Sequence, residues 1–167
     1  MSRVVCDTGP LITLEKIPDG FGFIGKLVDR ILIPESVLAE IGHHFAKPSD
    51  YLATHGIENL VEVHPDPGED PVIPGLMRLH AGEAAAIRLA LHLDLPLLIE
   101  EDDGRTVAES AGLAISGIAG QILKASRQGL ASIELGKSLL LAMVTANRLD
   151  TRTGQALLAD LSSLAEP

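Results

Sequence analysis

The stretch that decides the fold is VVCDTGPLITL, residues 4–14, in which an apolar run meets a single carboxylate, Asp7, just before a Gly-Pro pair. Residues 3–6, RVVC, contain two β-branched valines and predict a short buried strand. Residues 10–17 predict a short helix that tolerates Pro10 in its first turn. An Asp at this junction has two interpretations: it caps a turn or helix, or it is the first ligand of a metal site.

The rest of the chain alternates strand-like apolar runs with helical patterns. We expect further strands at residues 31–34, 60–63, 95–100 and 113–116, and helices at 21–30, 34–44, 49–55, 81–93, 103–113, 117–129, 133–146 and 151–164. An irregular, proline-containing loop follows residue 63, and Thr151 is a candidate cap for the last helix. This alternation is typical of βαβ units and predicts an α/β fold with a parallel sheet.

Length and composition limit the class of protein. A chain of 167 residues favours one domain, and 46% hydrophobic residues argue against disorder. Only 2% of the residues are aromatic, so Leu, Ile, Val and Ala must form the core. The single cysteine, Cys6, excludes an intramolecular disulfide, and no signal peptide follows Met1. We therefore expect a cytoplasmic protein, and no apolar stretch is long enough to span a membrane.

The net charge of −10 argues against a protein that grips nucleic acid mainly through a basic surface. It does not exclude an enzyme whose carboxylates surround divalent cations, because the cations neutralise part of the formal charge locally. The charge alone leans against nucleic-acid binding.

Several carboxylates are placed where they could converge. Functional sites of parallel sheets lie beyond the carboxyl ends of the strands, and both Asp7 and the EEDD run of residues 100–103 directly follow a strand. Glu40 lies within a predicted helix, and Glu83 opens another. Each also has a structural interpretation, as a cap, a solvated helix residue or a partner of the helix dipole. If they meet, their repulsion requires a cation such as Mg²⁺ or Mn²⁺.

Four segments, in order, resemble PIN-domain proteins. They are VVCDTGPLITL, ILIPESVLAEI, HAGEAAAIRLAL and LLIEEDDGRTVAESAGLAISGIAGQILKASRQGL, and they cover roughly residues 3–133. The sequence is most similar to the PIN-like branch related to the VapC toxins of prokaryotic toxin–antitoxin modules. The resemblance implies a three-layer α/β/α sandwich with a central parallel sheet. We expect one PIN-like domain over residues 1–167, with the C-terminal helices of about 133–164 packed on it.

The resemblance also implies a metal-dependent ribonuclease that cleaves RNA phosphodiester bonds, with Mg²⁺ or Mn²⁺ as cofactor. The implied catalytic acids are Asp7, Glu40, Glu83 and Glu101, and the implied metal ligands are Asp7, Glu83, Glu101 and Glu100. Thr8, Asp103 and Arg105 are supporting residues. Thr8 would orient Asp7 or a bound water. Arg105 would contact a phosphate or form a salt bridge with Glu101 or Glu109, and the salt bridge is the slightly favoured expectation.

Two departures from the family pattern leave a second interpretation open. The acidic pair after the strand commonly starts with Asp in this branch, whereas here both residues are Glu, and the following Asp102 and Asp103 make the rim more acidic. The alternative is a weak or inactive PIN-like domain that acts as a protein-binding module. A phosphatase-like or response-regulator-like α/β domain is a third, less favoured interpretation.

The resemblance implies two protein partners besides RNA. One is an antitoxin, and the other is a second copy of the chain in a homodimer. The apolar helix SLLLAMVTA, residues 138–146, is consistent with a dimer surface but could equally be buried within one chain.

Overall fold

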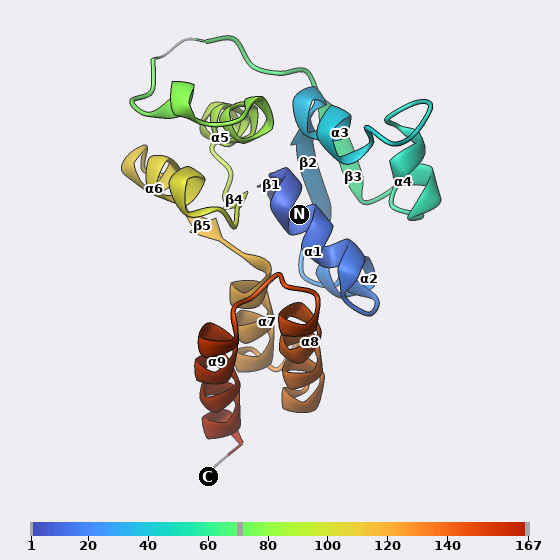
Figure 1. The fold of residues 1–167 in the computed structure, drawn as a ribbon, viewed down its shortest axis with the longest axis vertical. Helices are drawn as coiled ribbons and strands as arrows, with labels where there is room; N and C mark the ends of the chain where they lie inside the picture. Colours follow the sequence, from blue (N-terminus) through green and yellow to red (C-terminus); the bar gives the residue numbers. More distant parts are fainter. Residues whose placement is uncertain (1, 70–71, 166–167) are drawn as a thin grey trace. The chain divides into compact units, whose positions relative to one another are not determined.

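The computed structural model describes residues 2–69 and 72–165 (Figure 1). Its contacts divide the chain into two compact units. The first consists of Met1–Ile12 and Val28–Ser116, and the second of Thr13–Leu27 and Gly117–Pro167. Asp70 and Pro71, which belong to the irregular loop predicted after residue 63, lie outside the described residues. The single domain over residues 1–167 stays a prediction.

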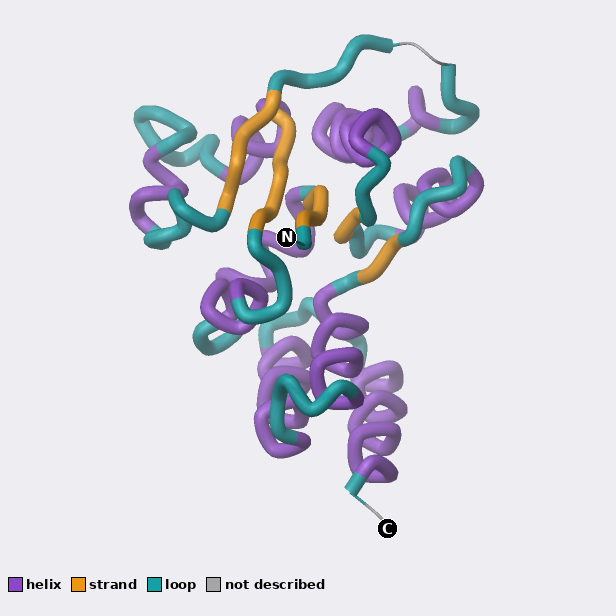
Figure 2. Tube along the Cα trace, turned by 180° about the vertical axis from the view of Figure 1, so that it is seen from behind, coloured by secondary structure: helices purple, strands orange, loops and turns teal. Residues whose placement is uncertain are grey.

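The first unit is built on a five-stranded sheet with the order β3-β2-β1-β4-β5, whose strands are drawn in orange in Figure 2. The strands are β1 (Arg3–Cys6), β2 (Arg30–Pro34), β3 (Val61–His64), β4 (Leu97–Leu98) and β5 (Ile115–Ser116). Every neighbouring pair is parallel. The structure confirms the predicted α/β class, a three-layer α/β/α fold with a central parallel sheet.

The strands are short. The three central ones, β1, β2 and β4, are buried except for Arg3 and Arg30, as expected for the middle of a parallel sheet covered on both faces, whereas the edge strands β3 and β5 are more exposed. Val5 in β1, Leu32 in β2 and Leu97 in β4 have essentially no exposed surface. Strand β4 begins later than the predicted residue 95 because Pro96 has no N–H to donate to a neighbouring strand. The Pro96 carbonyl nevertheless accepts a hydrogen bond from the Val5 N–H at 2.9 Å.

Four α-helices lie wholly within the described part of the first unit. They are α3 (Glu35–Ile41), α4 (Asp50–Thr54), α5 (Ala81–Leu93) and α6 (Asp102–Ser110), together with the short 3-10 helix η1 (Leu76–Arg78). Helix α5 packs against β1, β2 and β4, and α3 packs against α5, β2 and β3. Since α5 leads into the amino end of β4, its own first turn lies toward the carboxyl ends of the strands.

Helix α1 (Thr8–Lys16) starts in the first unit and continues into the second, with Pro10 in its first turn as predicted. Two helical predictions differ from the structure. The helix expected at 21–30 is α2 (Gly20–Gly25), which ends early because the chain must already be extended at Arg30 for β2. The helix expected to reach residue 44 ends at Ile41, and Gly42 lies so close to Pro48 that a Cβ there would be 2.5 Å from the Pro48 carbonyl oxygen.

The second unit contains α2 and three helices that pack on one another: α7 (Ile118–Arg127), α8 (Ile133–Thr145) and α9 (Thr151–Leu164). Leu139, Leu140 and Met143 of the apolar run 138–146 are buried within this unit, whereas Leu141 is 53% exposed. Three of the large apolar side chains of the run are thus buried within one chain. In the part of the chain that the structure describes, no helix combines the length and apolar character needed to cross a membrane.

The cap of α9 differs from the prediction. The side chain of Asp150, one residue before the predicted cap Thr151, accepts a hydrogen bond from the Thr153 N–H at 2.8 Å. A carboxylate at this position satisfies a helix N–H that has no partner within the helix. Thr151 is instead the first helical residue.

Replacing Asp150 with Ala should therefore lower the urea midpoint of unfolding, because one N–H at the start of α9 loses its acceptor. Thr151→Ala is the matched control and should leave the midpoint close to that of the parent. Circular dichroism in urea measures the midpoints. An equal decrease of the midpoint in the two variants would contradict the assignment of the cap.

Candidate functional site

The predicted site residues from β1 and β4 meet at one edge of the sheet. Strand β1 pairs with β4 so that Cys6 lies opposite Leu98, and the Asp7 N–H donates to the Leu98 carbonyl at 3.0 Å. The strand order reverses between these two strands, and such a switch point leaves a crevice beyond their carboxyl ends. Asp7 follows β1 directly and Glu100 lies two residues after the end of β4, so both residues belong to this carboxyl edge of the sheet.

Asp7 is a buried carboxylate with unused hydrogen-bonding capacity. Its side chain is only 3% exposed, and within the described residues its Oδ1 has no hydrogen-bond partner. Burial raises the pKa of Asp7 to about 6, a hydrogen bond from the Thr8 backbone N–H lowers it, and the charges of Glu40, Glu101 and Glu100 raise it further. The hydrogen bond from the Thr8 N–H occupies part of the Asp7 carboxyl group, but an orphaned buried oxygen is costly and calls for another partner.

Glu83 and Glu101 form a carboxyl pair. Glu83, in the first turn of α5, is 5% exposed and shares a side-chain hydrogen bond with Glu101, the residue just before α6. Burial is the main cause that raises the pKa of Glu83 to about 8; the bond to Glu101 and the charges of Asp7 and Glu101 add to it, and a backbone hydrogen bond at His80 lowers it. Two carboxyl groups can share a hydrogen bond only if one is protonated, so the pair retains a proton near neutral pH.

Glu40 is held by hydrogen bonds from two other segments. The Thr8 hydroxyl donates to Glu40 Oε2 at 2.6 Å, and the Gly82 N–H donates to Oε1 at 2.9 Å. Thr8 therefore bonds Glu40 through its hydroxyl, whereas the sequence predicted that it would orient Asp7 or a water. Gly82 was not identified from the sequence as part of the site. The signal that could have indicated it is a glycine beside an acid at the start of an apolar helix.

The remaining predicted residues lie in or after the turn between β4 and α6. Glu100 is half-buried, and its charge raises the pKa of Asp7. Asp103 is exposed in the first turn of α6, where a negative charge favours the helix dipole. Arg105 donates to the Ile99 carbonyl at 2.9 Å. The expected salt bridge of Arg105 with Glu101 or Glu109 is wrong for the described residues, because the guanidinium closes the β4–α6 turn instead.

We call Asp7, Glu40, Glu83, Glu100 and Glu101 the acidic cluster. Among residues 2–69 and 72–165, no three His, Cys, Asp or Glu side chains are arranged so that they could already hold a metal ion. Some of the carboxyl groups already have hydrogen-bond partners. Glu40 accepts from Thr8 and Gly82, and Glu101 shares a hydrogen bond with Glu83. The chemistry still fits a hard divalent cation, because the donors are all carboxylate oxygens and the buried Oδ1 of Asp7 is without a partner.

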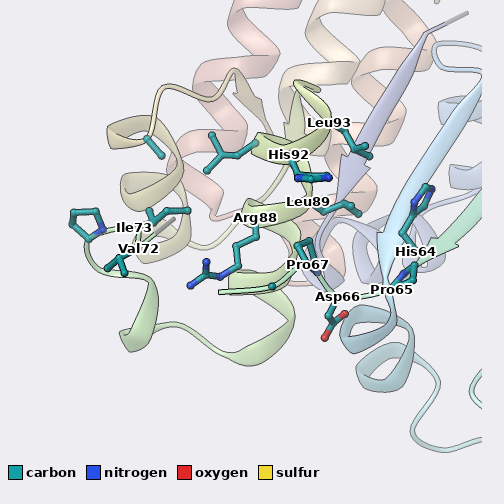
Figure 3. Close-up of a pocket in the computed structure, with 14 residues that line it drawn as sticks. His64, Pro65, Asp66, Pro67, Val72, Ile73, Arg88, Leu89, His92 and Leu93 are labelled. Atoms are coloured by element: carbon teal, nitrogen blue, oxygen red, sulfur yellow. The ribbon is translucent and has the colours of Figure 1, made fainter. Parts of the chain in front are cut away.

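A cavity of about 790 Å³ lies elsewhere in the first unit (Figure 3). Its walls are the loop after β3, with Pro65, Val72 and Ile73, and the C-terminal half of α5, with Leu89 and His92. None of the acidic cluster lines it, and Glu83 is in the opposite, N-terminal turn of α5. The lining is mostly apolar, so the cavity does not share the chemistry of the acidic cluster.

Comparison with known protein families identifies the family of this chain. A family model described as a PIN domain matches residues 3–166, nearly the whole chain and the whole of the acidic cluster. Among curated proteins, none matches the chain.

The raised pKa values predict how the metal-free protein responds to pH. Carboxyls of the unfolded chain titrate near pH ~4, whereas in the folded state the pKa of Asp7 is about 6 and that of Glu83 about 8. Between these limits the folded state binds more protons, so the free energy of unfolding should fall as the pH rises from 5 to 8.5. Thermal unfolding in EDTA measures this decline.

The Glu83→Gln variant should flatten the decline and stabilise the metal-free protein at pH 8.5, because the neutral amide mimics the protonated carboxyl. Glu109→Gln, at an exposed position of α6, is the control and should keep the slope of the parent. Equal slopes in the parent and Glu83→Gln would show that Glu83 does not titrate as described.

Proposed function

The chain belongs to the PIN-domain family, and from that premise we propose that it is a Mg²⁺- or Mn²⁺-dependent endoribonuclease. PIN domains have a nuclease-type fold, and the acidic cluster is the part of this chain that fits such an activity. The observation that carries the proposal is the buried Asp7, whose Oδ1 has no partner among the described residues, at the same sheet edge as the Glu83–Glu101 pair. Carboxyl groups are otherwise rarely buried without a counter-charge.

In this proposal Asp7, Glu83, Glu101 and Glu100 would hold the cation. When bound, the cation lowers the pKa of a water and offsets negative charge on the phosphate that is cleaved. The proton that Glu83 and Glu101 share must leave before both can act as anionic donors, so the pair holds that proton only in the metal-free protein. The backbone of Asp7 is anchored to the sheet, because its N–H donates to the Leu98 carbonyl.

The choice of RNA as substrate follows from the family resemblance, and the charge of the chain adds a condition. A net charge of −10 and the exposed Asp102 and Asp103 beside the site repel a polyanion. Arg105 can offset this repulsion only from a restricted position, since one of its guanidinium nitrogens donates to the Ile99 carbonyl. RNA binding should therefore depend strongly on the divalent cation.

The finer parts of the proposal concern partners and location. The exposed acids of the rim would suit a basic side chain of an antitoxin protein, which is the partner that the VapC-like resemblance implies. A homodimer and a cytoplasmic location belong to the same proposal. Size-exclusion chromatography with light scattering measures the molar mass and so tests for a homodimer. Co-expression with the product of a small adjacent reading frame, followed by co-purification, tests for an antitoxin partner.

Replacing Asp7 with Asn should remove one anionic oxygen donor and reduce Mn²⁺ affinity and RNA cleavage by more than about 100-fold, beyond what loss of a supporting residue costs. Calorimetric titration with Mn²⁺ and a gel assay on single-stranded RNA measure the two effects. Glu35→Gln, at an exposed residue of α3 outside the acidic cluster, is the matched control and should behave as the parent.

Cleavage by Asp7→Asn at the rate of the parent would refute the assignment of the site. A parent that binds Mn²⁺ but cuts no RNA would instead favour the protein-binding module. Chelation by EDTA should abolish cleavage, and added Mn²⁺ should restore it.

A further inference from the structure

Glu40 connects the two segments that carry the most buried acids of the cluster. Thr8, which donates to Oε2, is the neighbour of Asp7 in the chain, and Gly82, which donates to Oε1, is the neighbour of Glu83. The Glu40 carboxylate thus bridges the start of α1 and the start of α5 from its place in α3. Glu40 differs from Asp7 in that both of its carboxylate oxygens already accept a hydrogen bond, whereas Oδ1 of Asp7 has no partner among the described residues.

The bond to Gly82 depends on the absence of a side chain. A Cβ at position 82 would lie 2.5 Å from Glu40 Oε1 and 2.6 Å from Oε2. Glycine therefore lets the carboxylate reach an N–H of the first turn of α5, one of the groups that has no acceptor within the helix. A negative charge at this end of the helix is also favoured by the helix dipole.

We propose that Glu40 is a positioning residue that fixes Asp7 and Glu83 through Thr8 and Gly82, and that it is not itself a metal ligand. The inference rests on the proposed function, since it concerns the ligands of the proposed metal site. It moves Glu40 from the set of four catalytic acids to a supporting role. What the site requires at position 40 is an acceptor for the Gly82 N–H and a partner for the Thr8 hydroxyl.

Glutamine can meet both requirements without a charge. Its Oε1 accepts from the Gly82 N–H, and its NH₂ group donates to Thr8, whose hydroxyl changes from donor to acceptor. Glu40→Gln should therefore keep the Mn²⁺ dissociation constant within a few-fold of the parent. Glu40→Ala removes both bonds and should weaken Mn²⁺ binding about 10–100-fold, the usual effect of losing a group that orients metal ligands.

The Gly82 amide proton gives a readout that does not depend on metal or activity. In the metal-free protein its hydrogen exchange should be slow in the parent and in Glu40→Gln, and fast in Glu40→Ala. Thr8→Val leaves Glu40 in place but removes one of its bonds, so it should weaken Mn²⁺ binding several-fold, whereas Thr8→Ser should not. Thr8→Val also serves if Glu40→Ala fails to fold. Glu35→Ala, at an exposed position of the same helix, is the control and should match the parent.

The experiment is a calorimetric Mn²⁺ titration of these variants together with exchange measured by NMR. Retained Mn²⁺ affinity in Glu40→Gln with loss in Glu40→Ala and Thr8→Val supports the inference. If Glu40→Gln binds Mn²⁺ as poorly as Glu40→Ala while the Gly82 amide stays protected, Glu40 is a ligand and the inference is overturned alone. A parent that binds no Mn²⁺ overturns the proposed function and the inference together.

Discussion

The structure of the site depends on one constraint, which is the repulsion among carboxylates that the fold brings to a single edge of a parallel sheet. Burial intensifies this repulsion, because water no longer screens the charges. The two most deeply buried acids, Asp7 and Glu83, reduce this repulsion in different ways. Glu83 shares a proton with Glu101, and Asp7 keeps a raised pKa and an oxygen without a partner among the described residues. Both responses would be relieved by a divalent cation, and this is the physical basis on which we propose a metal site here.

The topology explains why these particular residues meet. The reversal of strand order between β1 and β4 places the ends of two neighbouring strands beside each other. The first turn of helix α5 lies at the same edge, because the helix runs from there to the amino end of β4. Helix α3 packs against α5 and supplies Glu40 from the side. The site is therefore assembled from four segments that are far apart in sequence, and all of them belong to the first unit.

The sequence predicted the larger features because they rest on local patterns. The α/β class, the parallel sheet and the helix Ala81–Leu93 follow from hydrophobic periodicity, and the shared edge of Asp7 and Glu100 follows from the placement of acids after strands. The partners of the acids could not be predicted in this way. The bonds from Thr8 and Gly82 to Glu40 join residues distant in sequence, and Arg105 found a backbone carbonyl rather than the acids at helical spacing. The cap of α9 was misplaced by one residue because Asp150 and Thr151 are both good capping residues.

The close approach at Gly82 has a consequence for how the sequence can vary. Any side chain at this position would occupy the space that the Glu40 carboxylate now fills. A side chain at position 82 would thus displace the Glu40 carboxylate and leave the amide at the helix start without its acceptor. The two positions, 42 residues apart in the chain, are therefore coupled in one direction: a larger residue at position 82 would also require a change at position 40, whereas glutamine at position 40 is compatible with Gly82.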